Sequence, residues 1–136
     1  MQLNPYLTFD GTCESAFKFY EQVLGGRIVA MVTFAQTPMA AQTPPEAQGK
    51  IVHARLDFAG QWLMGSDGMP GCYEAMKGFS VTVNVDEPTE ADRVFHALAE
   101  GGTVRMPIAE TFWAKRFGMV TDRFGTPWMV NCEKPM

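Results

Sequence analysis

The first half of the chain begins with a strand pattern that passes directly into a helix pattern. Residues 3–9 are typical of a short strand, and apolar residues within 16–24 recur at helical spacing. Asp10 and Glu14 offer carboxylates near the start of this helix, and Gly25-Gly26 ends it. Three further strands are predicted at residues 27–34, 51–58 and 61–64.

The second half repeats this order. Residues 79–85 alternate between apolar and polar side chains, and Thr89 begins a helix that ends before Gly101-Gly102. Three more strands are predicted at residues 103–108, 117–121 and 126–132. Each half is therefore predicted to be a βαβββ module.

Residue matches between the halves indicate an internal duplication. Asp57-x-x-Gly60 matches Asp122-x-x-Gly125 at an offset of 65, whereas the other matches lie at an offset of 76. The difference places an insertion in the first half, and the proline-containing residues 36–50 have the composition of a loop. We predict one domain, 1–136, built of modules 1–75 and 76–136. The matches at offset 76 are Asp10 with Asp86, Glu14 with Glu90, Phe19 with Phe95, and Gly25-Gly26 with Gly101-Gly102.

One helix can cover only one face of a four-stranded sheet, so the other face must pack against something or enclose a cavity. Two such modules predict an α+β fold with a curved, partly open, barrel-like mixed sheet. We expect the functional site on its concave side.

Composition narrows the function classes. The net charge of −4 and the pI near 5.1 argue against nucleic acid as a partner. The longest apolar run, residues 28–32, is far too short to cross a membrane, and the first residues lack a signal-peptide pattern.

Three cysteines without a C-x-x-C pair suggest the reducing cytoplasm. The 10 methionines and 10 phenylalanines suit either a packed core or a soft apolar cavity.

A polar stripe lies within the predicted strand 51–58. His53, Arg55 and Asp57 are spaced by two, so their side chains share one face of the strand. If this face lines a cavity, Arg55 could hold an anion and His53 could titrate near neutral pH. If this face of the strand is exposed to solvent, the stripe is only the polar, solvent-exposed side of the sheet.

Aromatic residues supply further candidates in the second half. Phe112-Trp113 could shield a ligand or pack a hairpin. Of the neighbours Trp128 and Met129, one must face inward because side chains alternate along a strand. Cys13 lies at a helix start, but no base accompanies it, so a buried structural role is favoured over a nucleophile.

Several segments together resemble the PhnB-like branch of the vicinal oxygen chelate superfamily, which includes glyoxalase I, bleomycin-resistance proteins and extradiol dioxygenases. The resemblance covers nearly the whole chain and implies paired βαβββ modules, a homodimer, and a ligand or metal site in each concave sheet. The segments are Asn4-Pro5-Tyr6-Leu7-x-Phe9, Phe19-Tyr20-x-x-x-Leu24-Gly25-Gly26, His53-Ala54-Arg55-Leu56, Phe112-Trp113-Ala114-x-x-Phe117-Gly118 and Thr121-Asp122-x-Phe124-Gly125-x-x-Trp128-Met129-Val130-Asn131.

The resemblance also shows where this chain departs from the superfamily's metal enzymes. Their ligand positions fall at Pro5, Met64, Phe79 and Met129, and none of these can bind a hard cation. Shifting the register by one residue gives Asn4, Gly65, Ser80 and Val130, which is no better. We therefore expect no metal and no cofactor.

The leading hypothesis is a cytoplasmic homodimer that binds a small organic molecule in an apolar cavity, with catalytic turnover left open. The predicted ligand-binding residues are His53, Arg55, Met64, Phe79, Phe112, Trp113, Trp128 and Met129.

Two alternatives remain open from the sequence. One is a metal-assisted lyase, isomerase or dioxygenase with unusual ligands such as His53 with Glu110 or Asp57, and the other is a structural protein with a filled cavity. PhnB-like domains also carry a demethylubiquinone methyltransferase label. The sequence argues against that activity, because it has no glycine-rich cofactor loop and no room for a second domain.

Overall fold

Both halves of the chain contain one helix and four strands in the order βαβββ, as predicted. The structure is a computed structural model that describes residues 1–135, and it divides into two compact units, Met1–Ala75 and Met76–Met136. The first unit contains β1 (Tyr6–Phe9), α1 (Cys13–Leu24), β2 (Arg27–Thr33), β3 (Ile51–Phe58) and β4 (Gln61–Asp67). The second contains β5 (Val81–Asn84), α2 (Pro88–Ala99), β6 (Thr103–Ala109), β7 (Ala114–Thr121) and β8 (Pro127–Glu133).

The two sheets have the same strand order, which is β1-β4-β3-β2 in the first unit and β5-β8-β7-β6 in the second. In each, the first and last strands of the unit are parallel neighbours and the other pairs are antiparallel. Tyr6 pairs with Met64, and Thr82 pairs with Met129. These two pairs are related by the offsets 76 and 65 found in the sequence, so the duplication extends to the register of the strands.

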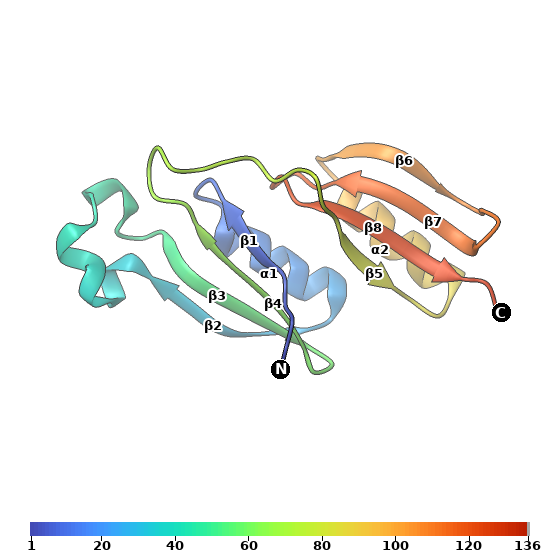
Figure 1. Cartoon of the computed structure of the whole chain (residues 1–136), viewed down its shortest axis with the longest axis horizontal. Helices are drawn as coiled ribbons and strands as arrows, with labels where there is room; N and C mark the ends of the chain where they lie inside the picture. Colours follow the sequence, from blue (N-terminus) through green and yellow to red (C-terminus); the bar gives the residue numbers. More distant parts are fainter. Residues whose placement is uncertain (136) are drawn as a thin grey trace. The chain divides into compact units, whose positions relative to one another are not determined.

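In the first unit, α1 covers one face of the sheet (Figure 1). Phe17 and Tyr20 of the helix are fully buried, together with Leu7, Phe9 and Leu56 from the strands. Gly65 of β4 lies under Phe17, because a Cβ at this position would be 2.8 Å from Cε1 of that ring. The helix and the strands thus share one apolar layer.

The second unit is built in the same way. Val94 and Leu98 of α2 are buried with Trp128, Val130 and Val120 of the sheet. Gly118 of β7 has the same role as Gly65 in the first unit, because a Cβ added at Gly118 would collide with the ring of Phe95. Figure 1 shows α2 lying across β7 and β8, which leaves the opposite face of this sheet without a helix.

The insertion differs from the expected loop. Residues 34–47 form three short 3-10 helices, η1 (Phe34–Gln36), η2 (Pro38–Gln42) and η3 (Pro45–Ala47). Gln48 Nε2 donates to the carbonyl oxygens of Ala40 and Thr43, at 2.9 and 2.8 Å, and closes this segment on itself. Side-chain hydrogen bonds of this kind leave no apolar periodicity in the sequence, which is why the pattern indicated only a loop. Within residues 1–135, neither long helix has the length and hydropathy of a membrane span.

Candidate functional site

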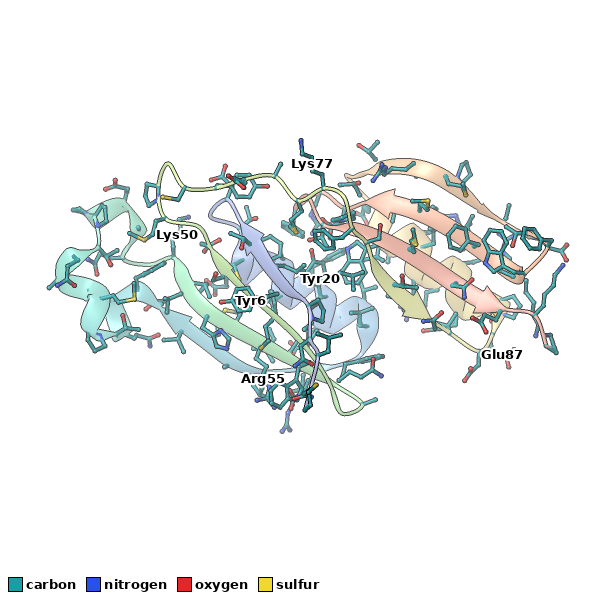
Figure 2. All side chains as sticks on the ribbon, viewed as in Figure 1. Tyr6, Tyr20, Lys50, Arg55, Lys77 and Glu87 are labelled. Atoms are coloured by element: carbon teal, nitrogen blue, oxygen red, sulfur yellow. The ribbon has the colours of Figure 1, made fainter. Side chains whose placement is uncertain are left out.

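The helix-free face of the first sheet, here called the first open face, carries aromatic and polar side chains. Because side chains alternate along each strand and Leu56 and Gly65 face α1, their neighbours Arg55 and Met64 face the other way. Tyr6 pairs with Met64, and Met64 pairs with Arg55, so the three lie side by side across β1, β4 and β3. Tyr6 and Arg55 are labelled in Figure 2.

His53 and Tyr6 interact on this face, although they are 47 positions apart in the sequence. Their rings are stacked with centroids 5.9 Å apart, and the Tyr6 hydroxyl lies 3.3 Å from His53 Nδ1. The pair offers a hydroxyl and an imidazole at the first open face, both able to donate or accept a hydrogen bond.

The Arg55 side chain interacts with both Asp57 and Trp62. Its Nε donates to Asp57 Oδ1 at 2.7 Å and its Nη2 to Asp57 Oδ2 at 3.2 Å, while the guanidinium lies 3.4 Å over the Trp62 ring. The guanidinium and the carboxylate form a bidentate ion pair whose net charge is zero. The polar stripe predicted from the sequence therefore lies on the open face, with Arg55 paired to Asp57.

The helix-free face of the second sheet, here called the second open face, is more apolar. Gly118 faces α2, so Phe117 and Met119 face away from the helix, and Met129 pairs with Met119 across β7 and β8. Asn131 lies opposite Phe117 and is hydrogen-bonded through its amide to Asn84 of β5. These side chains form a continuous surface over three strands.

An aromatic cluster adjoins the second open face. The Trp113 ring lies 5.2 Å from the Phe117 ring and 4.8 Å from the Phe112 ring, edge to face in both cases. Phe112 is 90% exposed and Trp113 is 42% exposed. Large apolar side chains exposed to this degree in one cluster are typical of binding surfaces.

Two predicted site residues lie elsewhere. Trp128 faces α2 and is only 1% exposed, and its Nε1 donates to Asp122 Oδ2 at 2.8 Å. It belongs to the core, and Met129 is the residue that faces the open side. Phe79 precedes β5 and is 45% exposed, whereas Thr82 is the β5 residue opposite Met129.

The superfamily's metal does not fit the residues present. Met64 and Met129 lie on the open faces, and their register partners are Tyr6 and Thr82 rather than the Pro5 and Phe79 positions inferred from the sequence. A thioether, a phenol and a Thr hydroxyl do not match the His and carboxylate donors of these sites. No group of three or more His, Cys, Asp or Glu side chains within residues 1–135 is placed to hold a metal ion.

Cys13 lies at the start of α1 and is fully buried. Burial raises the pKa of its thiol far above the ordinary range, and the negative charges of Asp67 and Glu14 raise it further. A thiol that stays protonated is a poor nucleophile, in agreement with the structural role favoured by the sequence.

Several residues of the open faces were not among the predicted site residues, including Tyr6, Trp62, Phe117, Met119 and Asn131. Counting by two from Met129 would have pointed to Asn131, and counting by two from Met64 would have pointed to Trp62. Tyr6 and Phe117 give no such signal, because their place depends on the register between strands.

The strand order, the single helix on each sheet and the open faces define the class of protein: the chain has the glyoxalase/bleomycin-resistance fold. A glyoxylase/bleomycin resistance protein/dioxygenase domain from Frankia sp. EAN1pec shares this fold, with a TM-score of 0.63 at 12% identity over 98% of this chain and 95% of that one. The chain belongs to the family described as 3-demethylubiquinone-9 3-methyltransferase, whose profile matches residues 1–131.

Relatives span the whole chain. Protein PA1353 from Pseudomonas aeruginosa has a crystal structure with a TM-score of 0.91 and 51% identity, over 99% of both chains. The structure of a PhnB protein from Bacillus cereus has a TM-score of 0.78 and 25% sequence identity, over 97% of this chain and 99% of that one. Protein YjdN from Escherichia coli strain K12 is 37% identical over 98% of this chain and 97% of its own length. The resemblance to PhnB-like proteins and the predicted fold class are thus confirmed.

Proposed function

We propose that this protein binds a small organic molecule on its open sheet faces, without the metal of its superfamily. The observation that carries the proposal is the set of methionine and aromatic side chains on faces that no helix covers. Met106 and Trp113 are 44% and 42% exposed, and Phe117, Met119 and Met129 are half-buried beside them. Methionine-rich surfaces adapt to varied ligands, and aromatic rings add large apolar contacts.

Two catalytic alternatives have less support. A metal-assisted lyase, isomerase or dioxygenase using His53 with Asp57 or Glu110 would have to break existing pairs, because Asp57 holds Arg55 and Glu110 holds Lys134 at 2.9 Å. Methyl transfer, which the family description names, needs a bound methyl donor. Both connections from strand to helix, at 10–12 and 85–87, are short and lack a glycine-rich cradle.

The proposal includes a cytoplasmic homodimer. Three free cysteines within the described residues, among them the exposed Cys72, suit a reducing compartment. The exposed apolar side chains on the second open face favour association, and sedimentation velocity should give the mass of two 15.1 kDa chains. A monomer at micromolar concentration would reject this part of the proposal.

Tryptophan fluorescence can test ligand binding and place it on a face. Trp62 lies on the first open face and Trp113 adjoins the second, whereas Trp128 is buried under α2. A panel of aromatic and antibiotic-like compounds should quench the emission and raise the melting temperature, since a ligand stabilises the state that binds it. Loss of quenching in Trp113→Phe, but not in Trp62→Phe, would place the ligand on the second open face.

Alanine variants of the first open face provide a separate test. If His53 and Arg55 contact the ligand, His53→Ala or Arg55→Ala should weaken binding by about five- to tenfold. His96→Ala is the matched control, because His96 is exposed on α2. Unchanged affinity in both variants would remove these residues from the site, and no binding by any compound would favour a purely structural role.

A further inference from the structure

Three methionines lie in one row across the second sheet. Met129 of β8 pairs with Met119 of β7, and Met119 pairs with Met106 of β6. Residues paired across antiparallel strands project from the same face, and Met119 faces away from α2, so all three side chains lie on the second open face. Thr82 of β5, the register partner of Met129, ends the row. The row therefore carries three thioether sulfur atoms and no charged group.

The spacing of the row allows the three sulfur atoms to converge. Partners on neighbouring antiparallel strands have Cβ atoms about 4.5–5.5 Å apart. A methionine side chain is unbranched and has three rotatable bonds, so the sulfur atoms of the two outer residues can reach toward that of Met119. Met119 and Met129 are half-buried, Met106 is 44% exposed, and no helix covers this face (Figure 1). The row is therefore open to a small ion from solvent.

The first sheet shows that this row is not imposed by the fold. Its corresponding positions are held by Tyr6, Met64, Arg55 and Ala30. That row has a single methionine, and its Arg55 is a cation paired with Asp57. An apolar face is made equally well from leucine or valine, so three thioethers in register add a chemical property that apolar character alone does not require.

Thioether sulfur selects among metal ions. It is a neutral, polarisable donor that suits the soft cation Cu⁺, whereas hard and borderline ions prefer carboxylate and imidazole. Phe117 lies two residues before Met119 on the same face, and its ring is 5.2 Å from the Trp113 ring. Aromatic rings beside a cation attract it through their negative faces. The row therefore differs from the superfamily's metal sites in both its donor atoms and the ion that it suits.

We propose that Met106, Met119 and Met129 form a binding site for Cu⁺ on the second open face. Each sulfur atom donates one lone pair to the ion, and the ion keeps its oxidation state. Of the three residues, only Met129 occupies a position to which the family resemblance assigns a metal ligand. The inference goes beyond the proposed function, because the ligand is an inorganic ion and its binding depends on sulfur rather than on apolar character.

Titration with Ag⁺ tests the site, because this ion is as soft as Cu⁺ and is not oxidised by air. The parent protein is the Cys72→Ser variant, since exposed Cys72 offers a competing thiol while Cys13 and Cys132 are buried. In chloride-free buffer we expect one Ag⁺ per chain by isothermal titration. With ¹³C-methyl methionine, three of the ten methyl signals should shift, and that of Met64 should not. Cu⁺, supplied without oxygen in competition with a chromophoric chelator, should bind with the same stoichiometry.

Leucine variants separate the chemistry of sulfur from apolar packing. Met106→Leu, Met119→Leu and Met129→Leu keep the volume and the apolar character of the side chain, so the melting temperature should change little. Each variant should weaken Ag⁺ binding by about tenfold or more, and the triple variant should abolish it. Met64→Leu, on the first open face, is the matched control and should bind Ag⁺ as the parent does.

Two results would overturn the site. One is Ag⁺ binding that persists in the triple variant, which would place the ion at other residues, and the other is a parent protein that binds neither Ag⁺ nor Cu⁺. If a leucine variant does not fold, the methyl signals of the parent decide, and shifts confined to other methionines would also reject the site. The proposed function stands after any of these results, because an organic ligand needs only the apolar face.

Discussion

Two buried carboxylates satisfy several hydrogen-bond donors each, Asp67 across distant segments and Asp122 within one turn. Asp67 accepts the N–H of Cys13 through Oδ1 and the N–H of Ile51 through Oδ2, both at 2.9 Å. It therefore holds the start of α1, where the Thr12 side chain makes no capping bond. Asp122 accepts three hydrogen bonds, from the N–H groups of Phe124 and Thr126 and from Trp128 Nε1. Each carboxylate satisfies donors that burial would otherwise leave without water.

Replacing Asp122 with alanine tests this role. Asp122→Ala leaves three donors without their acceptor in a buried turn, so we expect the free energy of unfolding to fall by about 2–4 kcal/mol. Urea denaturation followed by circular dichroism measures the change. Asp10→Ala, at an exposed position, is the control and should change the midpoint little. Equal midpoints for the two variants would show that the Asp122 bonds add nothing to stability.

The thiols should differ sharply in reactivity. Cys72 is exposed, whereas Cys13 and Cys132 are buried, so a thiol reagent should label one cysteine rapidly in the native protein and three after unfolding. Cys72→Ser should remove the rapid phase. Rapid labelling of Cys13 in that variant, located by peptide mass spectrometry, would mean that the α1 terminus opens readily.

The raised pKa of Cys13 also predicts alkaline sensitivity. In the unfolded chain this thiol ionises near pH 8.5, while burial keeps it protonated in the fold. Above that pH the unfolded state binds fewer protons than the folded state, so stability falls as pH rises. Unfolding free energies measured from pH 7 to 10 should decline less in Cys13→Ala, and parallel curves for the two proteins would refute the assignment.

At the scale of elements, close packing of each helix requires a glycine in the sheet. Gly65 lies under Phe17 of α1 and Gly118 under Phe95 of α2. The two glycines lie at different positions of the two units, but each makes room for a phenylalanine ring of the helix. No helix packs on the open faces, so large side chains fit there.

Gly118→Ala should therefore disturb α2. The added Cβ would lie 2.5 Å from Phe95 Cε1, and overpacking of this kind costs about 1–3 kcal/mol of unfolding free energy. Gly49→Ala is the matched control, since nothing lies within 4 Å of a Cβ there. Thermal and urea unfolding should separate the two variants, and equal stability would mean that the Phe95 ring moves aside freely.

At the scale of the whole chain, duplication produced two sheets of equal topology and different surface chemistry. The first open face combines Tyr6, His53 and the Arg55–Asp57 pair, whereas the second is formed largely by Phe117, Met119 and Met129. Of the positions to which the family resemblance assigns metal ligands, one on each sheet is a methionine, Met64 in the first and Met129 in the second. The fold of the superfamily is retained.

The metal-free proposal predicts how the purified protein responds to chelation. Protein prepared without chelator should hold no stoichiometric nickel, zinc, manganese or iron by elemental analysis, and excess EDTA should leave the melting temperature unchanged. Addition of each metal should likewise produce no stabilisation. A stoichiometric metal, or a melting temperature that falls with EDTA and recovers with one metal, would revive the metal-assisted alternative.

Much of the fold followed from local patterns, and the candidate site followed only in part. The glycine pairs after both α-helices and the alternation in the strands located α1, α2 and the eight strands, because these signals are local, whereas the three 3-10 helices within residues 34–47 were predicted as a loop. The spacing by two placed His53, Arg55 and Asp57 on one face of β3, as the structure has them. The roles of the predicted site residues in ligand binding stay predictions. Trp128 was not separated from Met129, since alternation alone does not say which of two apolar neighbours faces the helix.

The sequence by itself determined the βαβββ order and the duplication, because each depends on residue identity and spacing along the chain. Only the tertiary structure decided which face of each sheet stays open and which residues meet there. The stacking of Tyr6 on His53 and the pairing of Asn84 with Asn131 join positions 47 residues apart. Such contacts depend on strand register and on where the helix packs, and both are set by burial of the whole apolar layer.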